Sequence, residues 1–171
     1  MKKKEIFVTN GARQTRKLGE LLAKELRGGE ILCLSGELGS GKTTFAQGIL
    51  RGLKIKGPYT SPTFVVMKKY HITHNTKHIS RQKKVLRVTS YELRDAYHID
   101  AYRVGPKDII ELGWKEIIAG KSNIVIVEWA ERIKNIIPED AIWIKFEHIG
   151  KNKRKIVIGN KAVGSWSGCG S

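Results

Sequence analysis

The feature that most constrains the fold of this chain is the segment 36–43, whose sequence GELGSGKT fits the pattern G-x-x-x-x-G-K-T. This pattern marks a phosphate-binding P-loop where a strand precedes it and a helix follows it. Apolar residues 31–34 stand before it as a buried strand would, and residues 44–53 carry apolar side chains at helical spacing. Because a glycine-rich turn with a chance lysine would not need these flanks, the sequence favours a P-loop.

Each position of the loop has a role in holding a triphosphate. Gly36, Gly39 and Gly41 have no Cβ atom, so the loop can wrap closely and turn its N–H groups inward. The helix that begins near Gly41 adds its positive end and its unpaired amides. Lys42 can place its ammonium group on the β- and γ-phosphates, and the Thr43 hydroxyl can bind Mg²⁺ that bridges them. The loop therefore predicts a nucleoside triphosphate with Mg²⁺ as the ligand.

Predicted strands and helices alternate along the rest of the chain. The helices are expected around 18–26, 44–53 and 106–120, and the strands at 5–9, 31–34, 97–100, 124–127, 142–146 and 155–158. Two weaker segments are an apolar run at 64–66 and a possible edge strand at 85–88, and the last two strands are expected at a sheet margin. The alternation predicts an α/β sandwich with a largely parallel centre. We expect one domain over residues 1–160 and a flexible tail over 161–171.

Composition excludes several other classes of protein. No apolar stretch approaches membrane-spanning length, and the short apolar run at 6–8 does not make a signal-peptide core. The two cysteines, Cys33 and Cys169, give neither a disulfide framework nor a zinc-binding spacing. We therefore expect a cytoplasmic protein that does not enter a membrane.

The chain is strongly basic, with a formal net charge of +16 from 32 Lys and Arg against 16 Asp and Glu. Between Leu38 and Tyr91 there are eleven Lys or Arg and no acidic residue. Such a charge can attract RNA or an acidic partner, or it can be a solvated basic surface. Charge alone does not decide between these two interpretations.

A P-loop also needs an acidic residue near Mg²⁺, and two carboxylates end predicted strands. Glu128 follows four apolar residues, as a Walker B acid does, and could bind Mg²⁺ or polarise the attacking water. Asp100 ends a less apolar segment and could serve the same site. Either carboxylate could instead cap a helix or pair with an arginine such as Arg103.

Two further residues have open roles from chemistry alone. Thr63 lies in a loop that follows Pro62, where switch segments touch the γ-phosphate in many nucleotide hydrolases, but it could also be an ordinary turn hydroxyl. Trp129, next to Glu128, could stack on or shield the site, or it could be a core or interface aromatic.

Several landmarks together resemble the TsaE family, formerly YjeE, over about residues 5–158. They are Thr15 in an amphipathic first helix, GELGSGKTT at 36–44, SPTF at 61–64, HIDAYR at 98–103 and VEW at 127–129. This resemblance implies an α/β fold, a P-loop NTPase three-layer sandwich with a mixed, centrally parallel sheet. It also implies an ATPase that binds ATP and Mg²⁺ and hydrolyses ATP slowly alone. It also implies action with the TsaB–TsaD pair, in which TsaD transfers the threonylcarbamoyl group to adenosine 37 of tRNA.

The resemblance also implies roles for individual residues. Thr43 and Glu128 would bind the metal, and Glu128, Lys42 and Asp100 would form the catalytic set. Thr15 would lie near the adenine, Thr63 would be a switch-like threonine, and Lys153 or Arg154, the latter being our choice, would approach the nucleotide. The phosphate-binding residues would be Gly39, Ser40, Gly41, Lys42, Thr43 and Thr44.

The chain departs from the family pattern in its basic segment, at about 71–96, which is longer than the usual link between the SPTF and HIDAYR segments. It could bind tRNA, contact a partner or form an elaborated hairpin. Two other functions share part of this evidence. A small-molecule or nucleoside kinase would have the same P-loop but would need an acceptor pocket and usually an arginine-bearing lid, for which 71–96 is the candidate. A nucleic-acid-binding module with a degenerate ATP site would explain the charge but not the intact P-loop.

Overall fold

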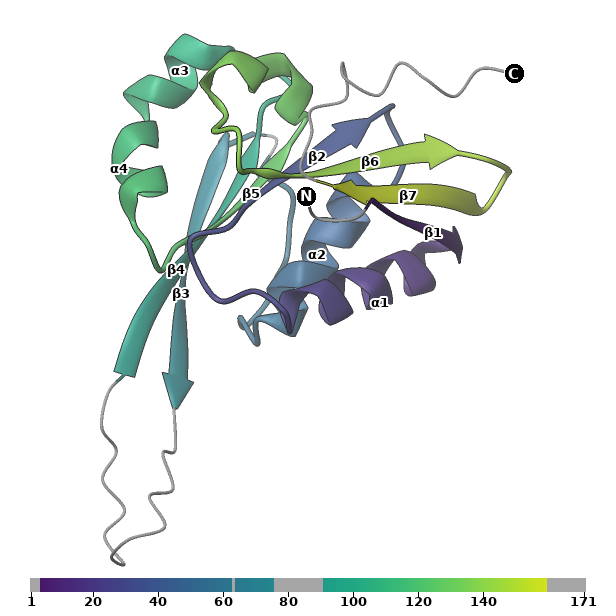
Figure 1. The fold of residues 1–171 in the computed structure, drawn as a ribbon, viewed down its shortest axis with the longest axis horizontal. Coiled ribbons are helices and arrows are strands. Elements are labelled where there is room, and N and C mark those ends of the chain that lie inside the picture. Colours follow the sequence, from purple (N-terminus) through teal and green to yellow (C-terminus); the bar gives the residue numbers. More distant parts are fainter. Residues whose placement is uncertain (1–3, 63, 76–90, 160–171) are drawn as a thin grey trace, which may run out of the picture.

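A computed structural model describes residues 4–62, 64–75 and 91–159, and its core is a single mixed sheet (Figure 1). The strands of the described part are β1 (Glu5–Asn10), β2 (Ile31–Gly36), β3 (Met67–Asn75), β4 (Tyr91–Asp100), β5 (Ile124–Glu128), β6 (Ile142–His148) and β7 (Lys153–Gly159). Their order across the sheet is β1-β7-β6-β2-β5-β4-β3. The central strands β4, β5, β2 and β6 are parallel, whereas β3 and β7 run antiparallel to their neighbours. The predicted mixed sheet with a parallel centre is confirmed.

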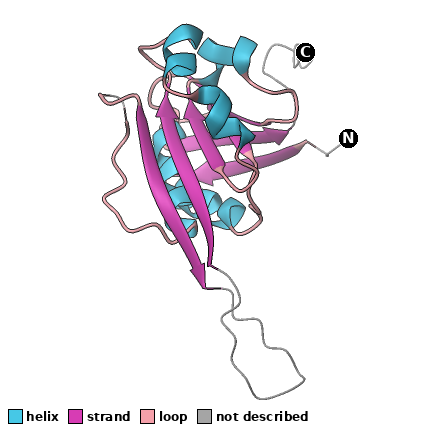
Figure 2. Cartoon of the chain, turned by 90° about the vertical axis from the view of Figure 1, so that its left-hand side faces the viewer, coloured by secondary structure: helices cyan, strands magenta, loops and turns pink. Residues whose placement is uncertain are grey.

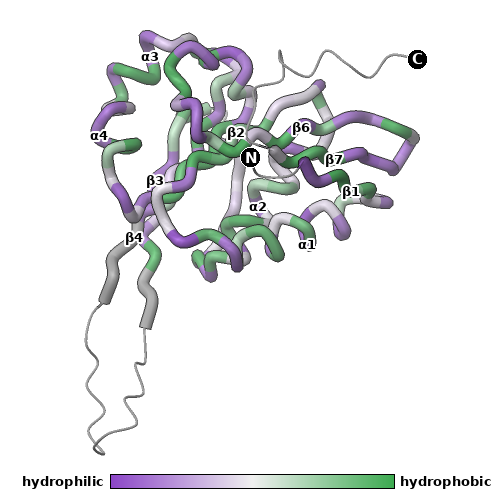
Figure 3. The backbone as a smooth tube through the Cα atoms, viewed as in Figure 1, coloured by the Kyte–Doolittle hydropathy of each residue, from purple (hydrophilic) through white to green (hydrophobic). Residues whose placement is uncertain are grey.

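Helices cover both faces of this sheet, which gives three layers (Figure 2). One face carries α1 (Ala12–Ala23) and α2 (Lys42–Gly52), and the other carries α3 (Pro106–Glu111), α4 (Trp114–Ala119) and the 3₁₀ helix η1 (Ala130–Ile136). β2 and β5 are therefore buried on both faces, which explains their continuous apolar runs (Figure 3). Among the described residues, no helix has the length and apolarity that a membrane span requires.

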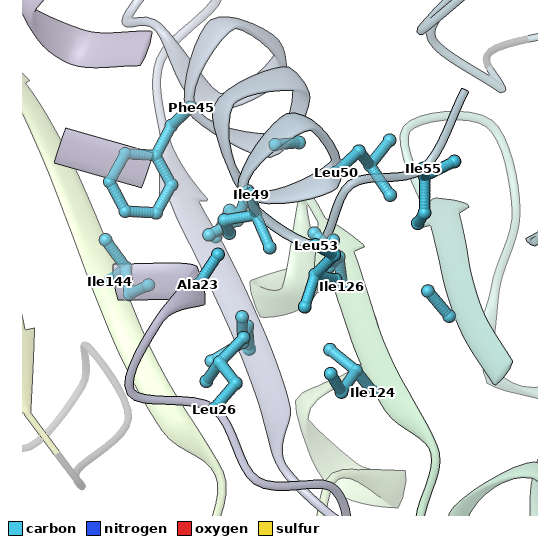
Figure 4. Close-up of a cluster of buried hydrophobic side chains, with 14 of the residues drawn as sticks. Ala23, Leu26, Phe45, Ile49, Leu50, Leu53, Ile55, Ile124, Ile126 and Ile144 are labelled. Atoms are coloured by element: carbon cyan, nitrogen blue, oxygen red, sulfur yellow. The ribbon is translucent and has the colours of Figure 1, made fainter. Parts of the chain in front are cut away.

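The α2 helix is held tightly against the sheet and against α1. Phe45, Ile49 and Leu50 are fully buried over the central strands (Figure 4). α1 and α2 touch at glycines: a Cβ atom on Gly48 would lie 2.2 Å from the Arg16 carbonyl oxygen, and one on Gly19 would lie 2.4 Å from that of Phe45. Because α2 begins at Lys42, this packing sets the position of the P-loop.

Two sequence expectations are wrong in detail, the single helix over 106–120 and the margin position of the strand at 142–146. The helix expected over 106–120 is two short helices, because Gly113 between them has a left-handed φ of +86°. Residues 64–66 form a turn in which Phe64 is 87% exposed, and the strand begins at Met67. β6 lies beside the central strand β2 rather than at a margin. Its alternating pattern reflects half-buried Lys145 and Glu147 on one face of the strand, not an edge position.

The described ends of the basic segment at about 71–96 form a hairpin. β3 and β4 pair antiparallel from Met67 opposite Ile99 to Asn75 opposite Tyr91. The possible strand at 85–88 and the tail at 161–171 lie outside the described residues, and so does Thr63.

Candidate functional site

The P-loop joins β2 to α2 at the carboxyl end of the parallel strands, where ligands bind in open α/β sheets. Gly36 has φ +135°, and a Cβ atom there would lie 2.4 Å from the Phe146 carbonyl oxygen. Gly41 has φ +107° and is the residue that precedes the first turn of α2. Both positions require glycine, one because β6 approaches closely and the other because the chain enters the helix in a left-handed conformation.

A cavity of about 400 Å³ opens in front of this loop. It is lined by Leu38, Gly39, Ser40, Gly41, Lys42, Thr43, Thr44, Asp100, Tyr102, Arg103, Glu128 and Trp129. The structure thus brings together the predicted phosphate-binding residues and both predicted carboxylates, although these come from three separate segments of the chain.

Lys42 is buried and bonded within the loop. Its Nζ donates to the Gly36 carbonyl oxygen at 2.7 Å and to that of Glu37 at 2.9 Å, and it lies 3.6 Å from the centroid of the Trp129 ring. Burial lowers the pKa of Lys42, although the nearby carboxylates of Glu131, Glu128 and Asp100 oppose this shift. An anionic ligand in the cavity would stabilise the charged form of this lysine, since burial disfavours the charge.

Glu128 is the centre of a chain of hydrogen bonds at the end of β5. Thr43 Oγ1 donates to Glu128 Oε2 at 2.5 Å, and His98 Nε2 lies 2.8 Å from Glu128 Oε1. A hydroxyl and a carboxylate are the oxygen ligands that Mg²⁺ takes from P-loop proteins, with waters and phosphates completing its octahedron. The side chains of Thr43 and Glu128 therefore fit a Mg²⁺ ion held between them.

Asp100 ends β4 directly beside Glu128, since the two residues are partners in the parallel register. Its Oδ2 accepts a hydrogen bond from Ser61 Oγ at 3.2 Å, and its Oδ1 accepts one from the Tyr102 amide at 3.0 Å. These contacts hold the carboxylate at the wall of the cavity and connect it to the loop that carries Ser61.

The remaining predicted site residues have different positions. Thr15 is buried behind the loop: its Oγ1 bonds Thr9 Oγ1 at 2.8 Å, and its methyl group lies 3.5 Å from where a Cβ on Gly41 would be. Thr15 is not among the residues that line the cavity, so its adenine contact stays a prediction. Arg154 Nη2 donates to the Gly39 carbonyl oxygen at 3.2 Å. Arg154 thus touches the P-loop, and its contact with a nucleotide also stays a prediction.

Sequence reasoning missed His98 and Tyr102. The tilted Tyr102 ring packs on Trp129 with 4.8 Å between centroids, so Trp129 contacts both Tyr102 and Lys42 in the cavity wall. His98 was visible only as part of a motif. The alternation of side chains along a strand could have pointed to His98, because a residue two positions before Asp100 must face the same side of the sheet as Asp100.

The chain is similar in sequence and in fold to known proteins. The sequence matches the family described as "Threonylcarbamoyl adenosine biosynthesis protein TsaE" over residues 9–82 and 85–156. A "tRNA threonylcarbamoyladenosine biosynthesis protein TsaE" from Aquifex aeolicus is 38% identical over 149 residues, which cover 86% of this chain and 90% of that protein. One of the same name from Rickettsia felis is 32% identical over 153 residues, which cover 87% and 76%. The crystal structure of Bacillus subtilis YdiB is similar with a TM-score of 0.68 at 28% identity, over 92% of this chain and 86% of that one.

Proposed function

The chain belongs to the TsaE family of tRNA threonylcarbamoyladenosine biosynthesis, and from this premise we propose that it binds ATP with Mg²⁺ and hydrolyses the ATP. It does so as a subunit that acts with TsaB and TsaD homologues in modifying adenosine 37 of tRNA. The observation that carries the proposal is the convergence of Lys42, Thr43 and Glu128 on one cavity at the P-loop.

Different residues of the cavity bind different parts of the nucleotide and its metal ion in this proposal. The amides from Gly39 to Thr44 and the start of α2 hold the phosphates, and Lys42 leaves the loop carbonyls to contact them. Thr43 and Glu128 would hold Mg²⁺, which would supply positive charge to stabilise the phosphate oxygens. Glu128 and Asp100 orient the water that attacks the γ-phosphate. Trp129 and Tyr102 form an aromatic wall that limits access of other water to the site.

A partner at the mouth of the cavity is supported by apolar side chains that are unusually exposed there. Leu38 at the tip of the P-loop is 76% exposed, and Tyr102 is 40% exposed. Phe64, 87% exposed, packs over the Arg103 guanidinium with 5.2 Å between the Arg103 Cζ atom and the ring centroid. Clustered exposed apolar groups beside a site are typical of a protein interface. A partner that covers them would enclose the nucleotide, which explains why hydrolysis by the isolated chain is expected to be slow.

Reconstitution tests this function. The purified chain is combined with TsaB, TsaD, threonylcarbamoyl-adenylate and tRNA, and modified adenosine is counted per TsaD with and without ATP. We expect multiple turnovers only with ATP and the intact chain. Failure of ATP to change the number of turnovers would overturn the assignment.

A small-molecule or nucleoside kinase is the alternative that shares the P-loop. The segment that could act as its lid begins and ends in β3 and β4, and β4 enters the cavity only at its last residue, Asp100. Tyr91, at the other end of β4, is on the order of 30 Å away along the strand. The described arms of the hairpin therefore lead away from the phosphate site, which disfavours a lid. Transfer of phosphate to a metabolite, rather than its release to water, would favour the kinase.

A further inference from the structure

His98 has no role in the site as described so far, yet it is one of the few buried polar side chains in the part of the chain that the structure describes. It is 1% exposed and lies in β4, two residues before Asp100. Burying an imidazole costs free energy unless its nitrogen atoms form hydrogen bonds. The burial of His98 therefore has to be explained by its hydrogen-bond partner.

That partner is Glu128. His98 Nε2 lies 2.8 Å from Glu128 Oε1, and both side chains are almost completely buried. The other ring nitrogen, Nδ1, has no hydrogen-bond partner among the described residues. Because an ionised carboxylate only accepts hydrogen bonds, Nε2 must carry the proton in this contact. The described polar contact of the ring is thus a donation to one oxygen of Glu128.

The sheet fixes the geometry of this donation. In the parallel register β4 places His98 opposite Ile126 and Asp100 opposite Glu128, so Glu128 reaches His98 along a diagonal of the same face. Both strands are buried and paired on each side, which leaves the two side chains little freedom. The hydrogen bond from His98 occupies Oε1, while Oε2 faces Thr43 Oγ1 at 2.5 Å.

We propose that His98 is a positioning residue, which holds Glu128 Oε1 so that Oε2 is presented to the Mg²⁺ that Thr43 also binds. This inference rests on the proposed ATPase function. Partners of metal-ligating carboxylates typically change metal affinity or activity by about 10- to 100-fold when they are removed. The competing explanation is a core histidine that only fills space, and it predicts that any well-packed replacement will do.

Two amide substitutions separate these explanations. Glutamine at position 98 places its Nε2 donor near the place of the histidine Nε2, whereas the shorter asparagine side chain does not reach Glu128. The readout is the gain in affinity for a non-hydrolysable ATP analogue when saturating Mg²⁺ replaces EDTA, because this ratio reports coupling between metal and nucleotide. We expect His98→Asn to lower this gain about tenfold and His98→Gln to stay within about threefold of the wild type. Affinity in EDTA should not change, because the P-loop amides and Lys42 remain.

Thermal melting of each variant verifies that it is folded. Should His98→Asn not fold, His98→Leu replaces it, since leucine is apolar, of comparable size and has no donor, and the same tenfold loss is expected. The positioning role would be overturned if the Mg²⁺ gain of His98→Gln equalled that of the variant without a donor in reach of Glu128, which is His98→Asn or its replacement His98→Leu. A wild-type protein without any Mg²⁺ gain or hydrolysis would instead overturn the proposed function, so the two failures are distinguishable.

Discussion

Glu128 is the residue on which the proposed chemistry of this site most depends, because its two oxygens have different partners. Oε1 is held by His98 and Oε2 by the Thr43 hydroxyl. Without a metal ion, Thr43 donates its proton to the carboxylate. With Mg²⁺ between them, both groups would turn lone pairs towards the ion. The contact between Thr43 and Glu128 is therefore where we propose that the metal binds.

Replacing Glu128 should separate hydrolysis from binding. We expect Glu128→Ala to lower kcat for ATP hydrolysis at least about 100-fold, since both metal binding and orientation of water are lost. Some ATP affinity should persist, because Lys42 and the loop amides still contact the phosphates. Phosphate release and ATP-analogue titration measure the two effects on the same protein. Hydrolysis at the wild-type rate would remove Glu128 from its catalytic role.

Thr43 allows a matched test of the metal-binding hydroxyl. Thr43→Val keeps the shape of the side chain but removes the oxygen, whereas Thr43→Ser keeps the oxygen. We expect valine to weaken Mg²⁺-dependent ATP binding about tenfold, which is about 1.4 kcal/mol, and serine to change it little. Calorimetric titration at several Mg²⁺ concentrations compares the three proteins. If serine and valine weakened binding equally, the hydroxyl would not be the relevant group.

At the scale of elements, the site depends on how closely α1 and α2 approach each other. Gly48 of α2 faces the backbone of α1, where no side chain fits beside the Arg16 carbonyl oxygen. The start of α2 carries Lys42 and Thr43, so a shift of this helix moves both residues relative to Glu128 of β5. Helix packing thus acts directly on the distance between Thr43 and Glu128, where the metal is proposed to bind.

The substitution Gly48→Ala tests this dependence. The new methyl group would lie 2.2 Å from a backbone oxygen that cannot turn aside, so the helices must separate. We expect the free energy of unfolding to fall by about 2 to 3 kcal/mol, together with a loss of ATP affinity. Arg13→Ala, at an exposed position of α1, is the control and should change stability by less than about 0.5 kcal/mol. Urea unfolding of both variants measures the two changes in stability. The comparison requires that the slope of the free energy of unfolding against urea concentration is equal in the two variants.

Local sequence patterns predicted the strands and helices better than they predicted the contacts between them. The continuous apolar runs before the P-loop and before Glu128 identified β2 and β5, because a strand buried on both faces needs such a run. The break at Gly113 was not predicted, since glycine inside a helical pattern is compatible with either a continuous helix or a left-handed turn. The partner of His98 could not be read from the sequence, because it depends on the register between β4 and β5, which are paired across more than twenty residues of chain.

At the scale of the whole molecule, positive charge is distributed unevenly along the chain. The formal charge is +16, and the P-loop-to-hairpin region from Leu38 to Tyr91 carries eleven Lys or Arg without an acidic residue. Some of the charge at the base of the hairpin is neutralised locally: Lys69 Nζ lies 2.9 Å from Asp95 Oδ2, and His71 Nδ1 lies 2.7 Å from Asp95 Oδ1. Burial tends to raise the pKa of Asp95, but the hydrogen bonds from Lys69 and His71 outweigh it and leave that pKa lowered. Asp95 is thus ionised at neutral pH and offsets part of the local charge.

The basic residues between the two strands of the hairpin have no such acidic neighbours in the sequence. Lys83, Lys84 and Arg87 lie outside the described residues, and the expectation rests on their charge alone. If this segment contacts RNA, the triple variant Lys83→Ala/Lys84→Ala/Arg87→Ala should bind tRNA more weakly. The slope of log affinity against log salt should also become shallower by up to about three, since each phosphate contact contributes about 0.7 to 0.9. Basal ATP hydrolysis should not change, because this variant keeps every residue proposed above to bind the phosphates and Mg²⁺.

The matched control neutralises three exposed basic residues in and just after α3 and α4, in Lys107→Ala/Lys115→Ala/Lys121→Ala. Both variants lose the same net charge, so a general attraction between a basic protein and RNA would weaken equally in the two. We expect the hairpin variant to lose more affinity and more salt dependence in filter-binding or fluorescence titrations with tRNA. Equal losses would identify the charge as a solvated basic surface, and the tRNA contact would then belong to the partner subunits.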